Sequence, residues 1–122
     1  MHKFRELKVY QKAVVLSHNV RELTKKFPKE EIYVLSSQLR RAADSIALNT
    51  AEGAGNSSRK EFSKFIGYSV RPAYECIACL DIAEKSNYNS DAERKRYFAQ
   101  IDEIIAMLIG LQKSLNKSDS NI

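Results

Sequence analysis

The chain has 122 residues, 43% of them hydrophobic, and its 20 Lys and Arg against 15 Asp and Glu give a formal net charge of +5 and a pI near 9.2. This length and apolar content predict one domain with its own core, and the positive charge favours anionic partners. The apolar runs are far shorter than the roughly 20 residues that a membrane span needs, and the N-terminal residues lead into no signal-peptide core. We therefore expect a cytoplasmic domain with no membrane contact.

The first predicted helix covers residues 6–26. Its apolar residues recur at alternating spacings of three and four, which is the period of an α-helix. They form one stripe, made of Val9, Ala13, Leu16, Val20, Leu23 and Phe27. Pro28 should end this helix, because the residue before a proline is pushed out of the helical region.

The second predicted helix reaches about Glu52 and carries the stripe Ile32, Leu35, Leu39, Ala42, Ile46 and Asn49. We expect Gly53 to end it in the left-handed conformation that glycine adopts most easily. Residues 54–57 would then lead to the next helix. A P-loop or dinucleotide site needs its glycines at fixed spacing after a strand, and the sequence predicts no strand here.

Two longer helices follow, and each opens with a capping box, Ser58 with Glu61 and Ser90 with Glu93. Pro72 lies inside the first of them and removes one helical hydrogen bond, to the carbonyl of Tyr68. The two stripes are Phe62, Ile66, Ser69, Ala73, Cys76, Leu80 and Ala83, then Tyr97, Ile101, Ile104, Leu108, Leu111 and Leu115. Residues 117–122 are predicted to be a frayed tail.

Four long helices with short connections predict an all-α fold, an antiparallel up-down-up-down four-helix bundle formed by residues 1–116. The short connections decide the topology, because they cannot carry the chain across the bundle.

The sequence offers no convincing catalytic, cofactor or metal site. Cys76 and Cys79 have the spacing of redox cysteines, but such thiols are reactive as exposed thiolates at a helix N-terminus, whereas these fall in mid-helix and should be buried and structural. Zinc would need two further ligands. Neither His2 nor His18 follows a glutamate at the spacing that a di-iron bundle requires. We expect a protein that is not an enzyme and has no small-molecule substrate.

A family resemblance rests on three segments, FRELKVYQKA, FPKEEIYVLSSQLRRAADSIALNTAEGAGNSSRKEF and AYECIACLDIA. They resemble the motifs of the bacterial four-helix-bundle family typified by proteins encoded in intervening sequences of large-subunit ribosomal RNA genes. The resemblance implies homopentamers without established enzymatic activity. It also implies kinship with accessory proteins of diversity-generating retroelements, which engage a reverse transcriptase and nucleic acid through basic surfaces. The chain departs from the family at Arg71 and Pro72, where a glycine–serine pair is usual.

The predicted topology brings many basic residues to one end of the bundle. The start of the first helix, the loop after the second and the end of the fourth would meet there. This end would gather Lys3, Arg5, Lys8, Lys12, Arg59, Lys60, Lys64, Lys113 and Lys117. In a cyclic oligomer it would repeat as a positive ring that binds phosphates, although a merely solvated basic face is the alternative for any one residue.

Arg40 and Arg41, placed midway along the second helix, would extend this basic strip along its side. The residues predicted to bind nucleic acid are therefore Lys8, Lys12, Arg40, Arg41, Arg59, Lys60 and Lys64.

The fourth helix carries a second apolar row, Phe98, Ile105 and Ile109, beside its core stripe. A monomer would leave this row exposed, so we expect it to form the subunit interface. The alternative is that the helix sits deeply in its own bundle.

Together these features predict a homo-oligomeric bundle that binds RNA or a nucleoprotein through its basic surface. The alternative is a protein–protein adaptor that recruits a partner, such as a reverse transcriptase, without binding nucleic acid itself.

Overall fold

The computed structural model describes residues 2–56 and 58–120, and within these ranges it contains helices and no strand. The elements are η1 (Lys3–Glu6), α1 (Lys8–Thr24), η2 (Lys29–Glu31), α2 (Leu35–Ala54), α3 (Arg59–Lys85) and α4 (Asp91–Ser120). The prediction of an all-α four-helix bundle is confirmed. The helix α4 includes the first residues of the predicted tail, whereas residues 121 and 122 lie outside the described part of the chain.

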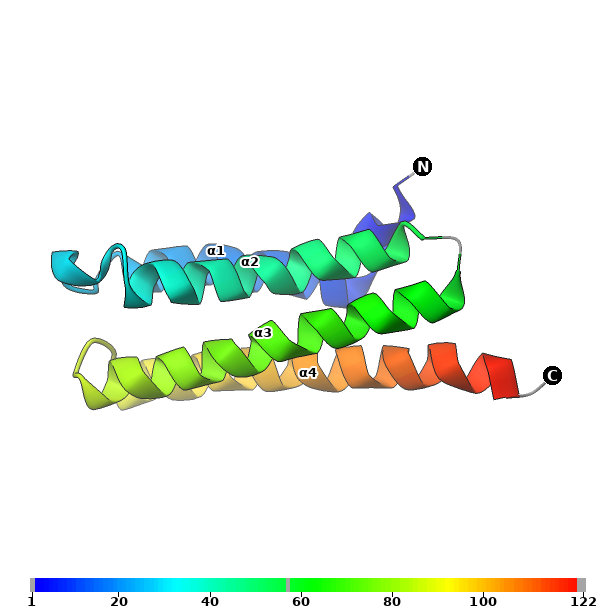
Figure 1. The fold of residues 1–122 in the computed structure, drawn as a ribbon. Coiled ribbons are helices and arrows are strands. Elements are labelled where there is room, and N and C mark those ends of the chain that lie inside the picture. Colours follow the sequence, from blue (N-terminus) through cyan, green and yellow to red (C-terminus); the bar gives the residue numbers. More distant parts are fainter. Residues whose placement is uncertain (1, 57, 121–122) are drawn as a thin grey trace.

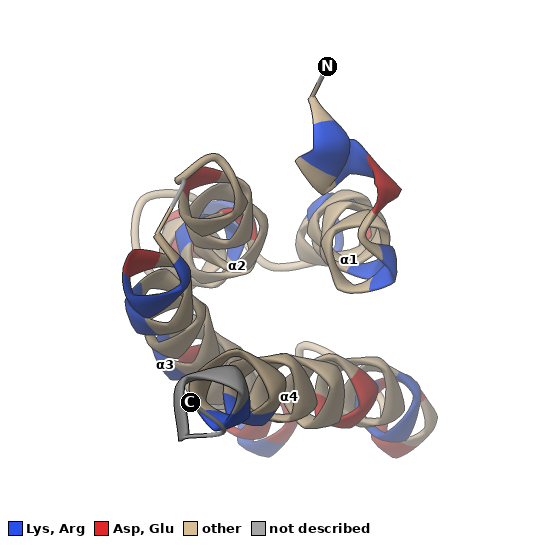
Figure 2. Cartoon of the chain, turned by 90° about the vertical axis from the view of Figure 1, so that its right-hand side faces the viewer, with Lys and Arg blue, Asp and Glu red and all other residues tan. Residues whose placement is uncertain are grey.

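Consecutive helices lie side by side, and α4 also lies beside α1. Figure 1 shows α1 leading from right to left, α2 returning, α3 leading left again and α4 returning to the right. The start of the chain, the connection between α2 and α3 and the end of α4 therefore lie at one end of the molecule. This is the end that faces the viewer in Figure 2.

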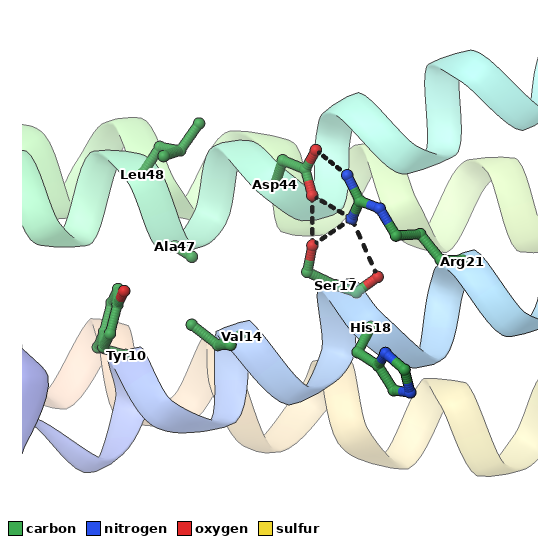
Figure 3. Close-up of a pocket in the computed structure, with 8 residues that line it drawn as sticks. All are labelled: Tyr10, Val14, Ser17, His18, Arg21, Asp44, Ala47 and Leu48. Atoms are coloured by element: carbon green, nitrogen blue, oxygen red, sulfur yellow. Dashed lines mark hydrogen bonds and ion pairs between the residues drawn. The ribbon is translucent and has the colours of Figure 1, made fainter.

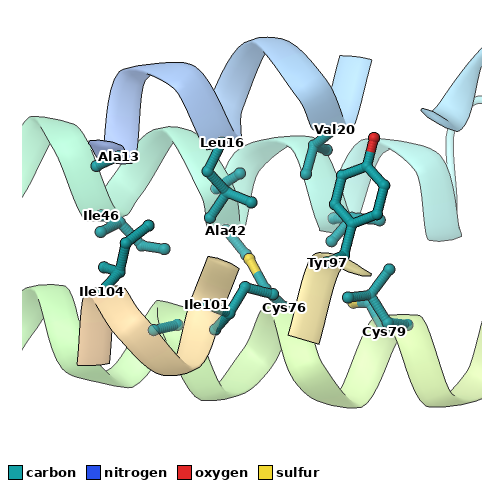
Figure 4. Close-up of a cluster of buried hydrophobic side chains, with 14 of the residues drawn as sticks. Ala13, Leu16, Val20, Ala42, Ile46, Cys76, Cys79, Tyr97, Ile101 and Ile104 are labelled. Carbon is teal, nitrogen blue, oxygen red and sulfur yellow. The ribbon is translucent and has the colours of Figure 1, made fainter. Parts of the chain in front are cut away.

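The core runs along the bundle axis and is filled by the predicted stripes. The largest fully buried side chains include Leu16, Leu39, Ile46, Ile66, Leu80, Ile101, Ile104 and Leu108, which come from all four helices. Figure 4 shows part of this cluster, where side chains from α1 and α2 meet those from α3 and α4. Burying each large side chain contributes about 1.5–3 kcal/mol, so the stripes account for the packing of the four helices.

The start of α2 differs from the prediction. Residues 29–34 form η2 and a turn, so α2 begins only at Leu35, and Ile32, expected in the core, is 46% exposed. The Glu31 carboxylate explains this arrangement. It accepts a hydrogen bond from the backbone N–H of Leu35 at 3.3 Å and another from the Tyr88 hydroxyl at 2.8 Å. These bonds tie η2 to the start of α2 and to the connection before α4, which leaves Ile32 outside.

The prediction that Gly53 ends α2 in the left-handed conformation is wrong. Gly53 is a buried residue inside α2, which continues to Ala54, and no described glycine has a positive φ. A Cβ atom at Gly53 would lie 2.7 Å from the Cβ of Phe65 on α3. Gly53 therefore allows close approach of α2 and α3, a role that depends on tertiary contact.

Pro72 is buried within α3. Because proline has no N–H, the carbonyl of Tyr68 four residues earlier loses its usual helical donor. The side-chain Nδ2 of Asn49 on α2 donates to that carbonyl at 3.4 Å. The neighbouring helix thus supplies a substitute partner.

The second apolar row of α4 is not left exposed by the single chain. Ile105 is only 8% exposed, and Ile109 is partly buried against the core. Phe98 is also partly buried, and the Arg94 guanidinium lies 4.9 Å from the centre of its ring. The expectation that a monomer would leave this row exposed is therefore wrong, because α4 packs deeply against its own neighbours.

Candidate nucleic-acid interface

Lysine and arginine residues, blue in Figure 2, gather at the end of the bundle that faces the viewer. Lys3 and Arg5 come from η1, and the others come from the first turns of α1 and α3 and the last turns of α4. All of them are exposed, and we call this set the basic end: Lys3, Arg5, Lys8, Lys12, Arg59, Lys60, Lys64, Lys113 and Lys117. The structure thus brings together five of the seven predicted nucleic-acid-binding residues, Lys8, Lys12, Arg59, Lys60 and Lys64.

Some of these cations have partners within the chain. Lys12 Nζ lies 3.1 Å from a Glu103 carboxylate oxygen, and Lys64 Nζ lies 3.6 Å from Glu61. Arg59 Nη2 donates to the Ser114 carbonyl at 3.5 Å. Ion pairs this exposed are worth at most about 1 kcal/mol, so they leave the side chains able to reach a phosphate.

Arg40 and Arg41 lie along α2, away from the basic end, so their predicted role in extending the basic strip along the side of this helix stays a prediction. Arg41 lies 13 residues before Ala54, the last residue of α2, which places it about 20 Å along the helix from the basic end. Arg40 is partly buried, and its Nε donates to the Thr24 hydroxyl at 2.8 Å. Arg40 therefore joins α1 to α2 at the opposite end of the bundle.

At the opposite end of the molecule, several basic side chains form ion pairs with carboxylates of the same chain. Arg94 lies within 3.7 Å of Asp81, 3.0 Å of Glu84 and 3.2 Å of Asp91. Lys26 Nζ lies 2.7 Å from Glu93. The positive field of the protein is therefore concentrated at the basic end.

A groove of about 430 Å³ lies between α1 and α2, and it extends from near the basic end toward the middle of the bundle. Tyr10 and Val14 of α1 and Ala47 and Leu48 of α2 form its apolar part. Figure 3 shows Tyr10 and Val14 directed from α1 toward α2. Val14 is 43% exposed and Leu48 is 67% exposed, so this α1–α2 groove presents apolar surface to solvent.

A charged cluster closes the far end of the α1–α2 groove. Arg21 holds Asp44 through two bonds, Nη1 to Oδ1 at 2.7 Å and Nη2 to Oδ2 at 2.8 Å, and the Ser17 hydroxyl also donates to Asp44. Hydrogen bonding to Arg21 lowers the pKa of the Asp44 carboxyl and keeps it ionised. The cluster is thus a fixed ion pair that connects the two helices (Figure 3).

An aromatic pair borders the groove at the basic end. Phe4 of η1 packs edge-on against Tyr10 with ring centres 5.0 Å apart. The Gln11 side chain donates to the Arg5 carbonyl at 2.8 Å and so fixes η1 against α1. The aromatic pair therefore has a defined position beside Lys3, Arg5 and Lys8.

The α1–α2 groove is absent from the sequence-based prediction. Val14 and Leu48 lie off the core stripes, which marks them as apolar residues with no place in the core. The pairing of Arg21 with Asp44, 23 residues apart on different helices, has no signal in the sequence. Only the packing of α1 against α2 brings these residues together.

The cysteines are buried as predicted, with Cys76 inside the core of Figure 4. Burial raises the pKa of Cys76 to about 12 and that of Cys79 to about 11, so both thiols stay protonated at neutral pH. Among residues 2–56 and 58–120, no three His, Cys, Asp or Glu side chains are grouped to hold a metal ion. No helix in the same residues is long and apolar enough to span a membrane.

Comparisons with known proteins place this geometry in a family. A crystal structure of a protein with unknown function from the S23 ribosomal protein family of Bacteroides thetaiotaomicron VPI-5482 has the same fold, with a TM-score of 0.80. It is 24% identical in sequence, and the match covers 86% of this chain and 95% of that chain. No curated protein matches the chain. The model of the family described as 23S rRNA-intervening sequence protein matches residues 5–110, and the chain belongs to that family.

Proposed function

We propose that this protein is a non-enzymatic RNA-binding bundle that contacts RNA phosphates through its basic end. The observation that carries the proposal is the uneven distribution of charge. Exposed lysines and arginines from three helices and η1 gather at one end, while Lys26, Arg94 and Lys95 at the other end lie against carboxylates.

The start of α3 is the part of the basic end best suited to a phosphate. Ser58 caps this helix by accepting from the backbone N–H of Glu61 at 3.2 Å. The helix dipole favours an anion at this N-terminus, beside Arg59 and Lys60. Both side chains are exposed, so a phosphate has access from solvent.

Replacing Arg59 and Lys60 together by alanine tests this proposal. The double variant should bind RNA of any sequence more weakly by a similar factor, because phosphate contacts carry no sequence information. Lys85→Ala with Lys95→Ala, at exposed positions of the opposite end, is the matched control and should bind as the wild type does. Unchanged affinity and unchanged salt dependence in the Arg59 and Lys60 variant would contradict the proposal.

Self-association is a second part of the proposal, and the homopentamer is implied by family resemblance. Exposed apolar residues of α3 support it, because Tyr74 and Ile82 are 55% and 54% exposed and Ala78 is exposed between them. Their spacing of four places all three on one side of the helix. This α3 stripe offers an apolar surface for contact between subunits. The row Phe98, Ile105 and Ile109 does not, because it packs within its own chain.

A protein–protein adaptor is the alternative function. Tyr33 and Val34, which are 92% and 62% exposed at the end opposite the basic end, favour it because exposed apolar side chains commonly contact protein. An adaptor that binds a partner such as a reverse transcriptase would have no RNA affinity of its own. Direct RNA binding by the purified protein therefore separates the two functions.

A further inference from the structure

We propose that the RNA is single-stranded and that its unpaired bases stack in the α1–α2 groove while the basic end holds their phosphates. This inference rests on the proposed RNA-binding function and names the form of RNA and the surface that recognises its bases. It is carried by the position of an aromatic and apolar groove directly beside the basic end.

The aromatic rings supply the stacking surface. Tyr10 is only partly buried, and in Figure 3 its side chain stands in the groove toward Ala47. Phe4, also partly buried, meets it edge-on with ring centres 5.0 Å apart. The exposed part of either ring can stack on any base, because every base has a π-face.

The apolar walls extend this surface along α1. Val14 and Leu48 flank the α1–α2 groove with 43% and 67% exposure, although leaving such residues in water is unfavourable. A second hollow of about 320 Å³, lined by Arg5, Tyr10, Gln11 and Val14, continues the groove toward η1. From Tyr10 to the Arg21–Asp44 ion pair the groove runs about 16 Å, enough for more than one base.

The cations beside the groove are placed to meet the phosphates of a nucleic acid strand. Lys3, Arg5 and Lys8 lie beside the aromatic pair, where the phosphates of a strand entering the groove would pass. The far end carries the Arg21–Asp44 pair, in which the two charges offset each other. Base-sized apolar surface next to cations is the combination that single-strand binding proteins use.

A duplex cannot use this surface in the same way. Bases in an A-form helix are stacked on each other, and their edges in the deep major groove are out of reach of side chains. A duplex would contact the basic end through its phosphates alone. The groove therefore predicts a preference for single strands over duplexes of equal length.

The test compares the binding of a 12-nucleotide mixed-sequence RNA strand and its 12-base-pair duplex, by fluorescence anisotropy. Phe4→Leu with Tyr10→Leu should weaken binding of the strand about fivefold or more, because base–aromatic stacking is lost, and should leave duplex binding unchanged. Tyr33→Leu removes an exposed ring at the opposite end and is the matched control. Urea unfolding of each variant checks that the bundle is intact.

A second variant gives a direct readout of the site. The chain contains no tryptophan, so Tyr10→Trp places a single tryptophan in the groove, which can be excited separately from the tyrosines. Adding the single strand should quench its emission, and adding the duplex should not.

The outcomes separate this inference from the function on which it rests. Equal wild-type affinity for strand and duplex, or an unaltered strand affinity in the Phe4 and Tyr10 variant, keeps RNA binding and overturns the stacking site. Binding of neither RNA by the wild type overturns both proposals and favours a protein ligand for the groove.

Discussion

Gly53 determines how closely α2 and α3 approach. The nearest atoms to a Cβ at this position would be the Cβ of Phe65 at 2.7 Å and atoms of Phe62 at 3.2 and 3.3 Å. Such a contact cannot be relieved by rotating a flexible side-chain end, since it involves the Cβ and backbone of α3. The two helices would have to move apart.

We therefore expect Gly53→Ala to lower the free energy of unfolding by about 1–3 kcal/mol, in spite of the better helix propensity of alanine. Gly110→Ala is the matched control. Gly110 is exposed within α4, and a Cβ atom there would meet no atom of the described residues within 4 Å, so alanine should stabilise by about 0.5–1 kcal/mol. Urea unfolding followed by circular dichroism measures the free energy of unfolding of both variants. A Gly53→Ala variant as stable as the wild type would contradict close packing at this site.

The two cysteine thiols should be unreactive in the folded protein. Their pKa values of about 12 and 11 lie above the ordinary value of 9.0, so almost no thiolate exists at pH 8. A thiol reagent at that pH should label Cys76 and Cys79 slowly in the native protein and rapidly in urea. Fast native labelling would show that the thiols are accessible and that the structural role is wrong.

The same raised pKa values predict a pH effect on stability. Below about pH 9.0 both the folded and the unfolded chain keep the thiol protons, so the buried thiols contribute fully to the free energy of unfolding. As pH rises above that value the unfolded chain loses these protons first, so the free energy of unfolding falls. Replacing both cysteines by alanine should reduce this alkaline loss while lowering stability at pH 7.

The start of α4 is held both by contacts within its first turn and by a contact to the end of α1. The backbone N–H of Ser90 donates to the Glu93 carboxylate at 3.0 Å, and the Glu93 N–H donates to the Ser90 hydroxyl at 3.0 Å, which confirms the predicted capping box. Glu93 also accepts a hydrogen bond from Lys26 at 2.7 Å, from just beyond the end of α1. One carboxylate thus starts α4 and ties it to the end of α1.

Glu93→Gln should make stability less dependent on pH. Hydrogen bonding to Lys26, followed by the Ser90 backbone, lowers the pKa of Glu93 below its ordinary 4.5. The stabilisation is therefore complete above that pH and is lost as pH falls through the folded-state pKa. Urea midpoints should differ between wild type and variant at pH 7, and the difference should be smaller at pH 3, below the ordinary pKa of 4.5. An equal difference at both values would contradict the role of this charge, and Glu52→Gln at an exposed position of α2 is the control.

The helices themselves could be predicted from the sequence because the core repeats every three or four residues. Leu16, Leu39 and Ile101 are all in the predicted stripes and are fully buried. The start of α2 could not be predicted, since Ile32 continues the apolar period but the Glu31 contacts to Leu35 and Tyr88 place it outside the helix. The apolar pattern of the sequence therefore predicts which residues are helical, whereas the contacts of the Glu31 carboxylate determine where α2 begins.

Across the molecule as a whole, the charge distribution follows from topology. Once the helices alternate in direction, η1, the start of α3 and the end of α4 must share an end, so the basic end could be predicted. The contact of Arg40 with Thr24 could not, because it joins side chains of two different helices. The α1–α2 groove also required the structure, since its walls come from two helices.

Self-association can be tested with two lysine substitutions. Ile82→Lys places a charge on the exposed α3 stripe and should dissociate the oligomer while helicity persists. Ile105→Lys buries a charge inside the chain and should unfold it instead. Sedimentation and circular dichroism distinguish these outcomes. A monomeric wild type would contradict self-association, and an oligomer unaffected by Ile82→Lys would contradict the α3 interface.

The dependence of RNA affinity on salt concentration is the sharpest test of phosphate binding at the basic end. Such binding releases counterions, so the logarithm of the association constant should fall linearly with the logarithm of salt concentration. Three or more phosphate contacts on a single strand predict a slope of about −2 or steeper, and Arg59→Ala with Lys60→Ala should make the slope shallower by about 1.4 if each side chain contacts one phosphate. Absence of RNA binding at low salt, or an affinity that does not change with salt, would contradict a phosphate-binding role for the basic end.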